Sequence, residues 1–243
     1  MRLDRIVQAA DEVIALVRGI ATLGGTRGDT SGLVMYSAYA SGFRRFVAIR
    51  DLANDGSADE AGVLTRSLVN ILVRAAWIDT PTDKNRRRDR FRRLLRRQYE
   101  DDLYELELQQ AAGFVVDTDS IRRTRENLNE LLADGVKAMP PDRQLFEAVN
   151  LDPIYARVYV PASNAMHFSM NAAIGHMLDV EEVALERRSL ADAADVLILA
   201  IIVFGTLLEL SERTVKHGLN ERAADIGKRM LHDLDNASPR PGV

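Results

Sequence analysis

A tyrosine, a serine and a histidine are spaced so that one helix would hold their side chains together. Tyr159, Ser163 and His167 follow one another at intervals of four residues. On an unbroken helix this spacing places them within about 80° of one another. Two hydroxyl groups beside an imidazole can form a hydrogen-bonded ladder in which the histidine takes up or releases a proton near neutral pH. Ser163 and His167 are therefore candidate proton-transfer residues, with Tyr159 as a binding neighbour.

A second set of polar residues, Arg66 and Asn70, lies one helical turn apart in a segment that is otherwise mostly apolar. A cation in such a segment is costly to bury unless it is paired. Arg66 must therefore reach a carboxylate, backbone carbonyl groups or a bound anion. A structural ion pair and an anion site are both open at this stage, and Asn70 would share the surroundings of Arg66.

The sequence argues against a serine hydrolase and against metal-dependent catalysis. Ser163 has no glycine-flanked nucleophile turn, and no third residue can be assigned to orient His167, which argues against a serine hydrolase. The Glu-x-x-His pattern of helical di-iron proteins does not occur, and the chain has no cysteine. We therefore expect neither a metal site nor a cofactor.

Charge is concentrated in one segment of the chain. The 243 residues carry a net charge of −4, yet residues 84–97 hold nine basic residues and one acid, so this segment is +8 and the remainder −12. Five arginines fall on the side of the expected helix opposite Phe91. They predict a solvated basic stripe, made of Arg86, Arg90, Arg93, Arg96 and Arg97.

Two interpretations of this stripe are open. Guanidinium groups suit phosphate and carboxylate alike, so the stripe could bind an anionic partner, either nucleic acid or an acidic protein surface. In the other interpretation the arginines pair within the protein, with acids on neighbouring helices or with Glu100 and Asp101 one turn further on. The acidic remainder of the chain offers many such partners.

The elements that must position these residues are all helical. Apolar residues recur every three or four positions, and no segment alternates as a strand would. This pattern predicts an all-α bundle of eight or nine helices, with one long helix near residues 82–112. We expect one domain over residues 1–235 and a disordered tail over residues 236–243. Pro161 predicts a kink or break near Tyr159 in a helix over residues 152–178. The other helices are expected at residues 2–22, 32–54, 57–77, 117–139, 142–150, 189–216 and 220–235.

The most apolar of these helices is expected inside the bundle. Its uncharged run, Val196 to Leu208, has only 13 residues, whereas a bilayer requires about 20. We therefore expect a buried core helix and no membrane contact. The amino terminus lacks a signal-peptide pattern and the chain lacks cysteine, which favours a cytoplasmic protein.

Two short motifs resemble a known family. The sequence Arg-Ser-Leu-x-Asn at residues 66–70 precedes Tyr-x-x-x-Ser-x-x-x-His at residues 159–167. Together they resemble an uncharacterised bacterial all-helical family with an Arg-Ser-Leu-x-Glu motif and a late Ser-x-x-x-His motif, over roughly residues 35–210. Asn70 stands where that family has an acid, which removes a carboxylate that could pair with Arg66 or act as a base. The resemblance implies an architecture more than an activity.

The sequence is more remotely similar to HEPN domains, which are helical and nucleotide-associated. Several of them are ribonucleases in toxin and phage-defence systems. Their hallmark is an arginine followed by a histidine after four to six residues, and this chain lacks it. Arg66 and His167 could replace it in space, because metal-free RNA cleavage requires only a proton-transfer group and a cation near the phosphate.

Two functions follow from these observations. The favoured one is a non-catalytic helical binding module, alone or as a homo-oligomer, that engages an anionic partner through the basic stripe or the Arg66 region in a bacterial defence or regulatory system. The alternative is a HEPN-like, metal-independent ribonuclease that uses Arg66, Ser163 and His167. The sequence leaves open whether the protein is an enzyme.

Overall fold

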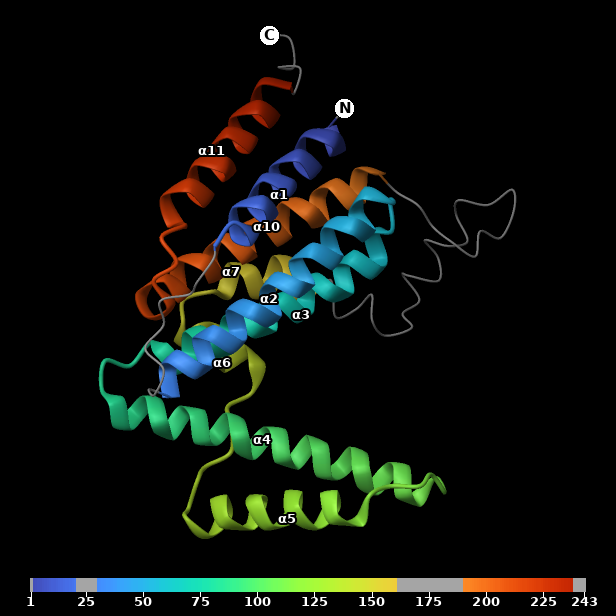
Figure 1. Cartoon of the computed structure of the whole chain (residues 1–243), viewed down its shortest axis with the longest axis vertical. Helices are drawn as coiled ribbons and strands as arrows, with labels where there is room; N and C mark the ends of the chain where they lie inside the picture. The colour runs from blue at the N-terminus through green and yellow to red at the C-terminus, as the bar shows by residue number, and fades with distance from the viewer. Residues whose placement is uncertain (1, 21–29, 161–189, 238–243) are drawn as a thin grey trace. The chain divides into compact units, whose positions relative to one another are not determined.

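The computed structural model describes residues 2–20, 30–160 and 190–237, and within these ranges it contains helices and no strand (Figure 1). The predicted all-α class is confirmed, and the long helix expected near residues 82–112 is α4. The elements are α1 (Arg2–Arg18), α2 (Thr30–Asn54), α3 (Ala58–Asp79), α4 (Lys84–Ala111), α5 (Thr118–Ala133), α6 (Asp142–Ala148), α7 (Asp152–Ile154), a π-helix (Tyr155–Tyr159), α10 (Leu190–Val215) and α11 (Asn220–Ala237).

Two helix ends differ from the prediction for local reasons. Helix α4 starts at Lys84, later than expected, because the carboxylate of Asp83 accepts a hydrogen bond from the Asn85 backbone N–H at 2.9 Å. Helix α5 ends at Ala133, where the prediction continued to residue 139. Gly135 follows with a φ of +71°, which terminates the helix in a left-handed turn.

The expected irregularity near Tyr159 is present as a π-helix. Residues Tyr155–Tyr159 have this wider hydrogen-bonding pattern directly after α7. Pro161, on which the expectation rested, lies outside the described residues. At the other end of the chain α11 extends to Ala237, two residues into the predicted tail, and residues 238–243 are not described.

The chain divides into two compact units by its internal contacts. One unit comprises residues 1–76 and 150–243, and the other comprises residues 77–149. The prediction of a single domain over residues 1–235 concerns how the chain folds and stays a prediction.

The core of the first unit is built on α10, which packs against α1, α2 and α11 (Figure 1). Helix α10 is apolar around most of its circumference, as a helix covered on several sides must be. Phe204 is fully buried and stacks on Phe46 of α2, with ring centroids 4.7 Å apart and an interplanar angle of 10°. Gly42 lets α2 approach this core, since a Cβ there would meet Leu207 and Leu68.

Two described helices, α3 and α10, are long and apolar enough to cross a membrane, and half of each apolar window is buried within the structure. Core helices of soluble proteins satisfy the same criterion of length and composition, so this observation is weak evidence for membrane insertion. In α10 the buried half is the face that packs on α1, α2 and α11.

Tyr39 provides a test of the first unit's interior. Burial, with a smaller effect of Tyr36, raises the pKa of Tyr39 to about 12 from 10.0. Between about pH 10 and pH 12 the Tyr39 phenol therefore stays protonated in the folded state and loses its proton in the unfolded state. The stability contributed by Tyr39 is complete below about pH 10 and is lost as the pH rises to about 12. An absorbance titration of the folded protein should show a phenol transition near pH 12 that Tyr39→Phe removes; identical curves for the two proteins would contradict this assignment.

The second unit is formed by α4, α5 and α6. Helices α4 and α5 lie side by side, joined through the turn after Ala111 (Figure 1). All of its buried apolar side chains lie outside α4, at Trp77, Ile78, Ile121, Val136, Leu145 and Phe146. None of the 28 residues of α4, all of them described, is buried. Helix α4 therefore covers this small core without contributing a fully enclosed side chain.

Candidate functional site

Arg66 of α3 contacts Tyr159 of the π-helix, 93 residues away in sequence. The Arg66 Nη2 donates a hydrogen bond of 3.3 Å to the Tyr159 hydroxyl, and the guanidinium carbon lies 4.8 Å from the centre of the Tyr159 ring. Tyr159 is buried, with 6% of its surface exposed, and stacks on Tyr155 at 5.5 Å. The structure therefore brings the beginning of the late motif to the arginine of the early motif.

The same side of α3 carries further polar residues at successive turns. Arg66, Asn70 and Arg74 are spaced four apart, and all three are half-buried. The Arg74 Nε atom is buried, and Arg74 has no hydrogen-bond or ion-pair partner among the described residues. The four-residue spacing that pairs Arg66 with Asn70 also extends to Arg74, which was not among the predicted site residues.

Helix α2 adds a third guanidinium group. The Arg45 Nε donates to the hydroxyl of Ser67 at 2.7 Å, and Arg45 Nη1 donates to the backbone carbonyl of Ser41 at 3.2 Å. Arg45 is half-buried and, within the described ranges, pairs with no acid. Arg45 was not among the predicted site residues, because only the contact between α2 and α3 brings it beside the Arg-Ser-Leu motif.

Ser163 and His167, the predicted proton-transfer residues, lie outside the described residues. The ladder that starts at Tyr159 therefore stays a prediction. Among the predicted site residues of this unit, the structure describes Arg66, Asn70 and Tyr159 and places two of these three in direct contact.

The arginines of α4 are paired to a large extent within the second unit. Three of them bind acids one turn away: Arg93 binds Asp89 at 2.7 Å, Arg96 binds Glu100 at 2.8 Å and Arg97 binds Asp101 at 2.9 Å. These pairs support the interpretation in which the basic segment is neutralised internally. The two pairs with Glu100 and Asp101 are those that the spacing predicted.

Other arginines of α4 reach the protein interior. Arg90 lies over the Trp77 ring at 4.9 Å and donates to the Trp77 carbonyl, and burial lowers the pKa of Arg90. Arg96 also donates to the Val136 carbonyl at 2.7 Å. The prediction of a solvated stripe is therefore wrong for Arg90, Arg93 and Arg96, which are half-buried, whereas Arg86 and Arg97 are exposed.

His217, to which the sequence analysis assigned no role, lies at the centre of a hydrogen-bonded cluster. Its Nδ1 is 2.7 Å from a carboxylate oxygen of Glu212, and its Nε2 is 2.9 Å from the Ser211 hydroxyl and 3.0 Å from the Leu208 carbonyl. Serine, histidine and glutamate are the residue types of a hydrolase triad. Ser211, however, is 0% exposed, and its hydroxyl donates to the Leu208 carbonyl. The cluster therefore holds the turn between α10 and α11 and offers no accessible nucleophile.

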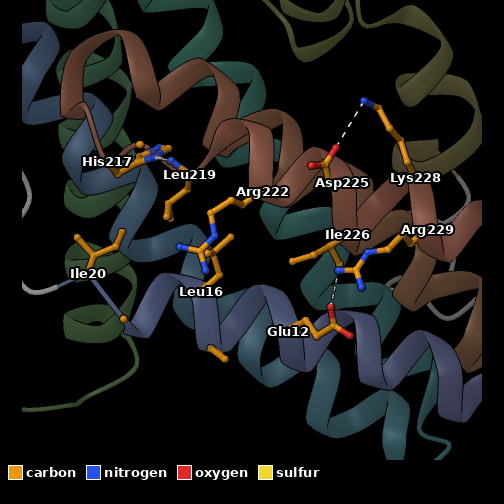
Figure 2. A pocket seen from close by; sticks show the side chains of 13 residues that line it. Glu12, Leu16, Ile20, His217, Leu219, Arg222, Asp225, Ile226, Lys228 and Arg229 are labelled. Carbon is orange, nitrogen blue, oxygen red and sulfur yellow. Dashed lines mark hydrogen bonds and ion pairs between the residues drawn. The ribbon is translucent and has the colours of Figure 1, made fainter.

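A groove of about 1000 Å³ borders this cluster between α1 and α11 (Figure 2). Most of its charges are matched, since Arg229 binds Glu12 at 2.8 Å and Lys228 lies 3.7 Å from Asp225. Arg222 extends from α11 toward α1 and has no acid partner in the described part of the chain (Figure 2). The groove thus shows one uncompensated cation on an exposed side chain.

The described residues define an all-helical protein in which Arg66 of α3 contacts Tyr159 and two further arginines, Arg45 of α2 and Arg74 of α3, are half-buried. A family model matches residues 33–183, and the chain belongs to that family, a family of unknown function (DUF5677). The match includes Arg45, Arg66, Arg74 and Tyr159. The predicted membership in an uncharacterised family is confirmed. No curated protein and no solved structure matches the chain.

Proposed function

We propose that the protein is a non-catalytic helical binding module that binds successive anionic groups of its partner at Arg45, Arg66 and Arg74. The observation that carries this proposal is the presence of Arg45 and Arg74, both half-buried, on neighbouring helices and without an acid among the described residues. A cation that is partly removed from water is stabilised when an anion joins it. A bound phosphate or carboxylate would supply that charge.

The α2–α3 arginines support this function better than α4 does. On α4 the half-buried Arg93 and Arg96 already bind acids, whereas neither Arg45 nor Arg74 binds an acid among the described residues. At the α2–α3 site, Tyr159 orients Arg66 through its ring and its hydroxyl, so this guanidinium has fewer conformations to lose on binding.

RNA is the anionic partner that we favour. Tyr155 is half-buried and stacks on Tyr159, so an aromatic pair lies beside the Arg66 guanidinium. Sites for single-stranded nucleic acid combine guanidinium groups with aromatic rings in this way. The proposal places the protein in the cytoplasm, consistent with a chain that has no cysteine.

Fluorescence anisotropy with a labelled single-stranded RNA tests this proposal. We expect Arg45→Ala and Arg74→Ala each to weaken binding about tenfold, because each removes a charge-assisted hydrogen bond to phosphate. Arg143→Ala is the matched control, since Arg143 is exposed, binds Glu147 at 3.0 Å and belongs to the other unit. Wild-type affinity should fall as salt rises from about 50 to about 200 mM.

Two results would overturn this assignment. One is RNA binding that survives the Arg45→Ala/Arg74→Ala double substitution. The other is the absence of RNA binding together with capture of an acidic polypeptide such as polyglutamate, which would transfer the site to an acidic protein partner. Circular dichroism of each variant confirms that the helices are intact.

The contact between Arg66 and Tyr159 also supports the ribonuclease alternative, because it places a cation beside the first residue of the predicted Tyr159–Ser163–His167 ladder. Incubation of the RNA with the protein and a metal chelator distinguishes the two functions. Cleavage that His167→Ala and Ser163→Ala abolish, with binding retained, would establish the HEPN-like, metal-independent reaction. An intact RNA in a stable complex supports the binding module.

A further inference from the structure

Large apolar side chains gather on the surface of the second unit, where α4 ends and the chain turns toward α5 (Figure 1). Four of them are exposed there: Tyr104 at 69%, Leu108 at 56%, Phe114 at 69% and Val115 at 104%. Single apolar residues are common on protein surfaces, whereas a contiguous group of them marks an interaction site. We refer to these four residues as the apolar tip.

Two residues of the apolar tip share one side of α4. Tyr104 and Leu108 are one turn apart, about 40° from one another around the helix axis. The half-buried Leu106 lies about 160° from both, on the opposite side of the helix. Tyr104 and Leu108 therefore point away from the packed side of α4 and into solvent.

The turn after α4 brings Phe114 toward this pair. Gly113 has a φ of +84°, and its N–H donates to the Gln110 carbonyl at 3.0 Å. The Phe114 N–H donates to the Gln109 carbonyl at 3.1 Å. These two bonds define a Schellman motif, in which the residue after the glycine turns back over the last turn of the helix, here toward Leu108. The apolar tip is therefore one continuous surface.

The surroundings of the apolar tip are acidic. Residues 98–121 contain seven acids and no basic residue, and arginines outside this segment bind five of the seven. Glu105, which is exposed beside Tyr104 and Leu108, accepts a hydrogen bond from Gln109 at 3.1 Å and pairs with no cation in the described part of the chain. A partner that covers the tip must therefore bring a cation as well as apolar side chains.

We propose that the apolar tip docks a basic amphipathic helix of a partner protein. The apolar stripe of such a helix covers Leu108 and Phe114, which removes their exposed surface from water. A lysine or arginine beside the stripe reaches the Glu105 carboxylate. A second cation can lie over the Tyr104 ring, whose face attracts positive charge.

Charge favours this occupant over two others. Contact between the tips of two copies of the chain would bring two Glu105 carboxylates together, which is unfavourable. A membrane surface with anionic headgroups attracts lysine and arginine, whereas this tip is bordered by acids. A basic helix is the occupant whose charge and apolar stripe both match the tip.

The apolar tip is distinct from the proposed anion site. It consists of residues of the second unit, whereas Arg45, Arg66 and Arg74 belong to the first. The two surfaces also attract partners of opposite charge. Failure of RNA binding would therefore leave the inference about the tip standing, and failure of helix binding would leave the proposed function standing.

Fluorescence anisotropy of a labelled synthetic helix of leucines and lysines, titrated with the full chain, tests the inference. A surface of this size makes a weak complex, so we expect a dissociation constant on the order of 10 µM. Leu108→Ser/Phe114→Ser should raise this constant at least about tenfold, because it removes the centre of the apolar surface. Glu105→Gln should raise it about threefold, since it removes one exposed ion pair.

The matched control removes two exposed leucines of the first unit, in Leu33→Ser/Leu231→Ser. These side chains are 65% and 47% exposed, and the control should bind the helix as the wild type does. A peptide with glutamates in place of the lysines should bind the wild type at least about tenfold more weakly. Circular dichroism establishes that every variant is folded.

The inference fails if the wild type does not bind the leucine–lysine helix, or if the tip variant binds it as tightly as the control does. Equal binding of the leucine–glutamate peptide would exclude a basic partner. A wild-type dimer in sedimentation velocity that Leu108→Ser/Phe114→Ser dissociates would assign the tip to a second copy of the chain. Binding to phosphatidylcholine vesicles that the same variant abolishes would assign it to a lipid surface.

Discussion

Replacing His217 by alanine is expected to lower the free energy of unfolding by about 3 kcal/mol. The imidazole is fully enclosed as a side chain and lies within hydrogen-bond distance of Glu212, Ser211 and the Leu208 carbonyl. Its ring also stacks on Tyr39, with centroids 5.5 Å apart. Alanine would remove all of these contacts at once.

The loss has two physical components. The substitution leaves a cavity beside Tyr39, whose lining loses its packing partners. It also frees Glu212 from its partner, while the carboxylate still accepts a hydrogen bond from the Gly218 backbone N–H at 2.9 Å. Because Gly218 has a φ of +69° in the turn between α10 and α11, we expect this turn to loosen first.

Urea denaturation followed by circular dichroism measures the change. His232→Ala is the matched control, since this histidine is exposed near the end of α11 and its replacement should cost less than about 0.5 kcal/mol. His217→Gln keeps a hydrogen-bonding side chain and should lose less stability than His217→Ala. Equal losses for His217→Ala and His232→Ala would show that the buried cluster contributes nothing specific.

Replacing Gly42 by leucine should destabilise the first unit by about 3 kcal/mol. A Cβ atom at position 42 would overlap the Leu207 side chain and lie 3.3 Å from Leu68 Cδ1. Both leucines are 0% exposed, so neither can move aside into solvent. The bulk of a leucine must therefore separate α2 from α10 or force strained rotamers in the core.

Gly62 of α3 is the control for this substitution. No atom lies within 4 Å of a Cβ built at Gly62. Gly62→Leu should therefore leave stability unchanged or raise it by up to about 1 kcal/mol, because leucine favours a helix more than glycine does. Thermal unfolding of both variants distinguishes a packing effect at Gly42 from the general effect of removing a glycine; similar changes in melting temperature would contradict the packing explanation.

The helices could be predicted from sequence because the periodicity of apolar residues is a local signal. Helices α2, α3 and α10 begin and end within about two residues of the prediction. The errors arose where one side chain or one backbone angle decides the end of a helix. Asp83 caps α4 two residues later than predicted, and the left-handed Gly135 stops α5 six residues early. Both are signals that a pattern of hydrophobicity does not contain.

The candidate site was less predictable because it depends on contacts between distant segments. The spacing identified Arg66 and Asn70, and the contact of Arg66 with Tyr159 joins two motifs selected separately. Arg45 was missed, since it becomes relevant only through the packing of α2 on α3. The prediction that Arg90 and Arg96 of α4 lie in solvent was also wrong. Their long side chains reach the carbonyls of Trp77 and Val136 from helix positions that point away from the core.

A helix without enclosed side chains is also free to change in evolution. Substitutions in a core cost stability through cavities or overpacking, whereas surface substitutions usually change it by less than about 0.5 kcal/mol. Helix α4 can therefore exchange most of its exposed residues while the interior of the protein keeps its sequence. Related chains could therefore bind different partners through α4 while they keep the same fold.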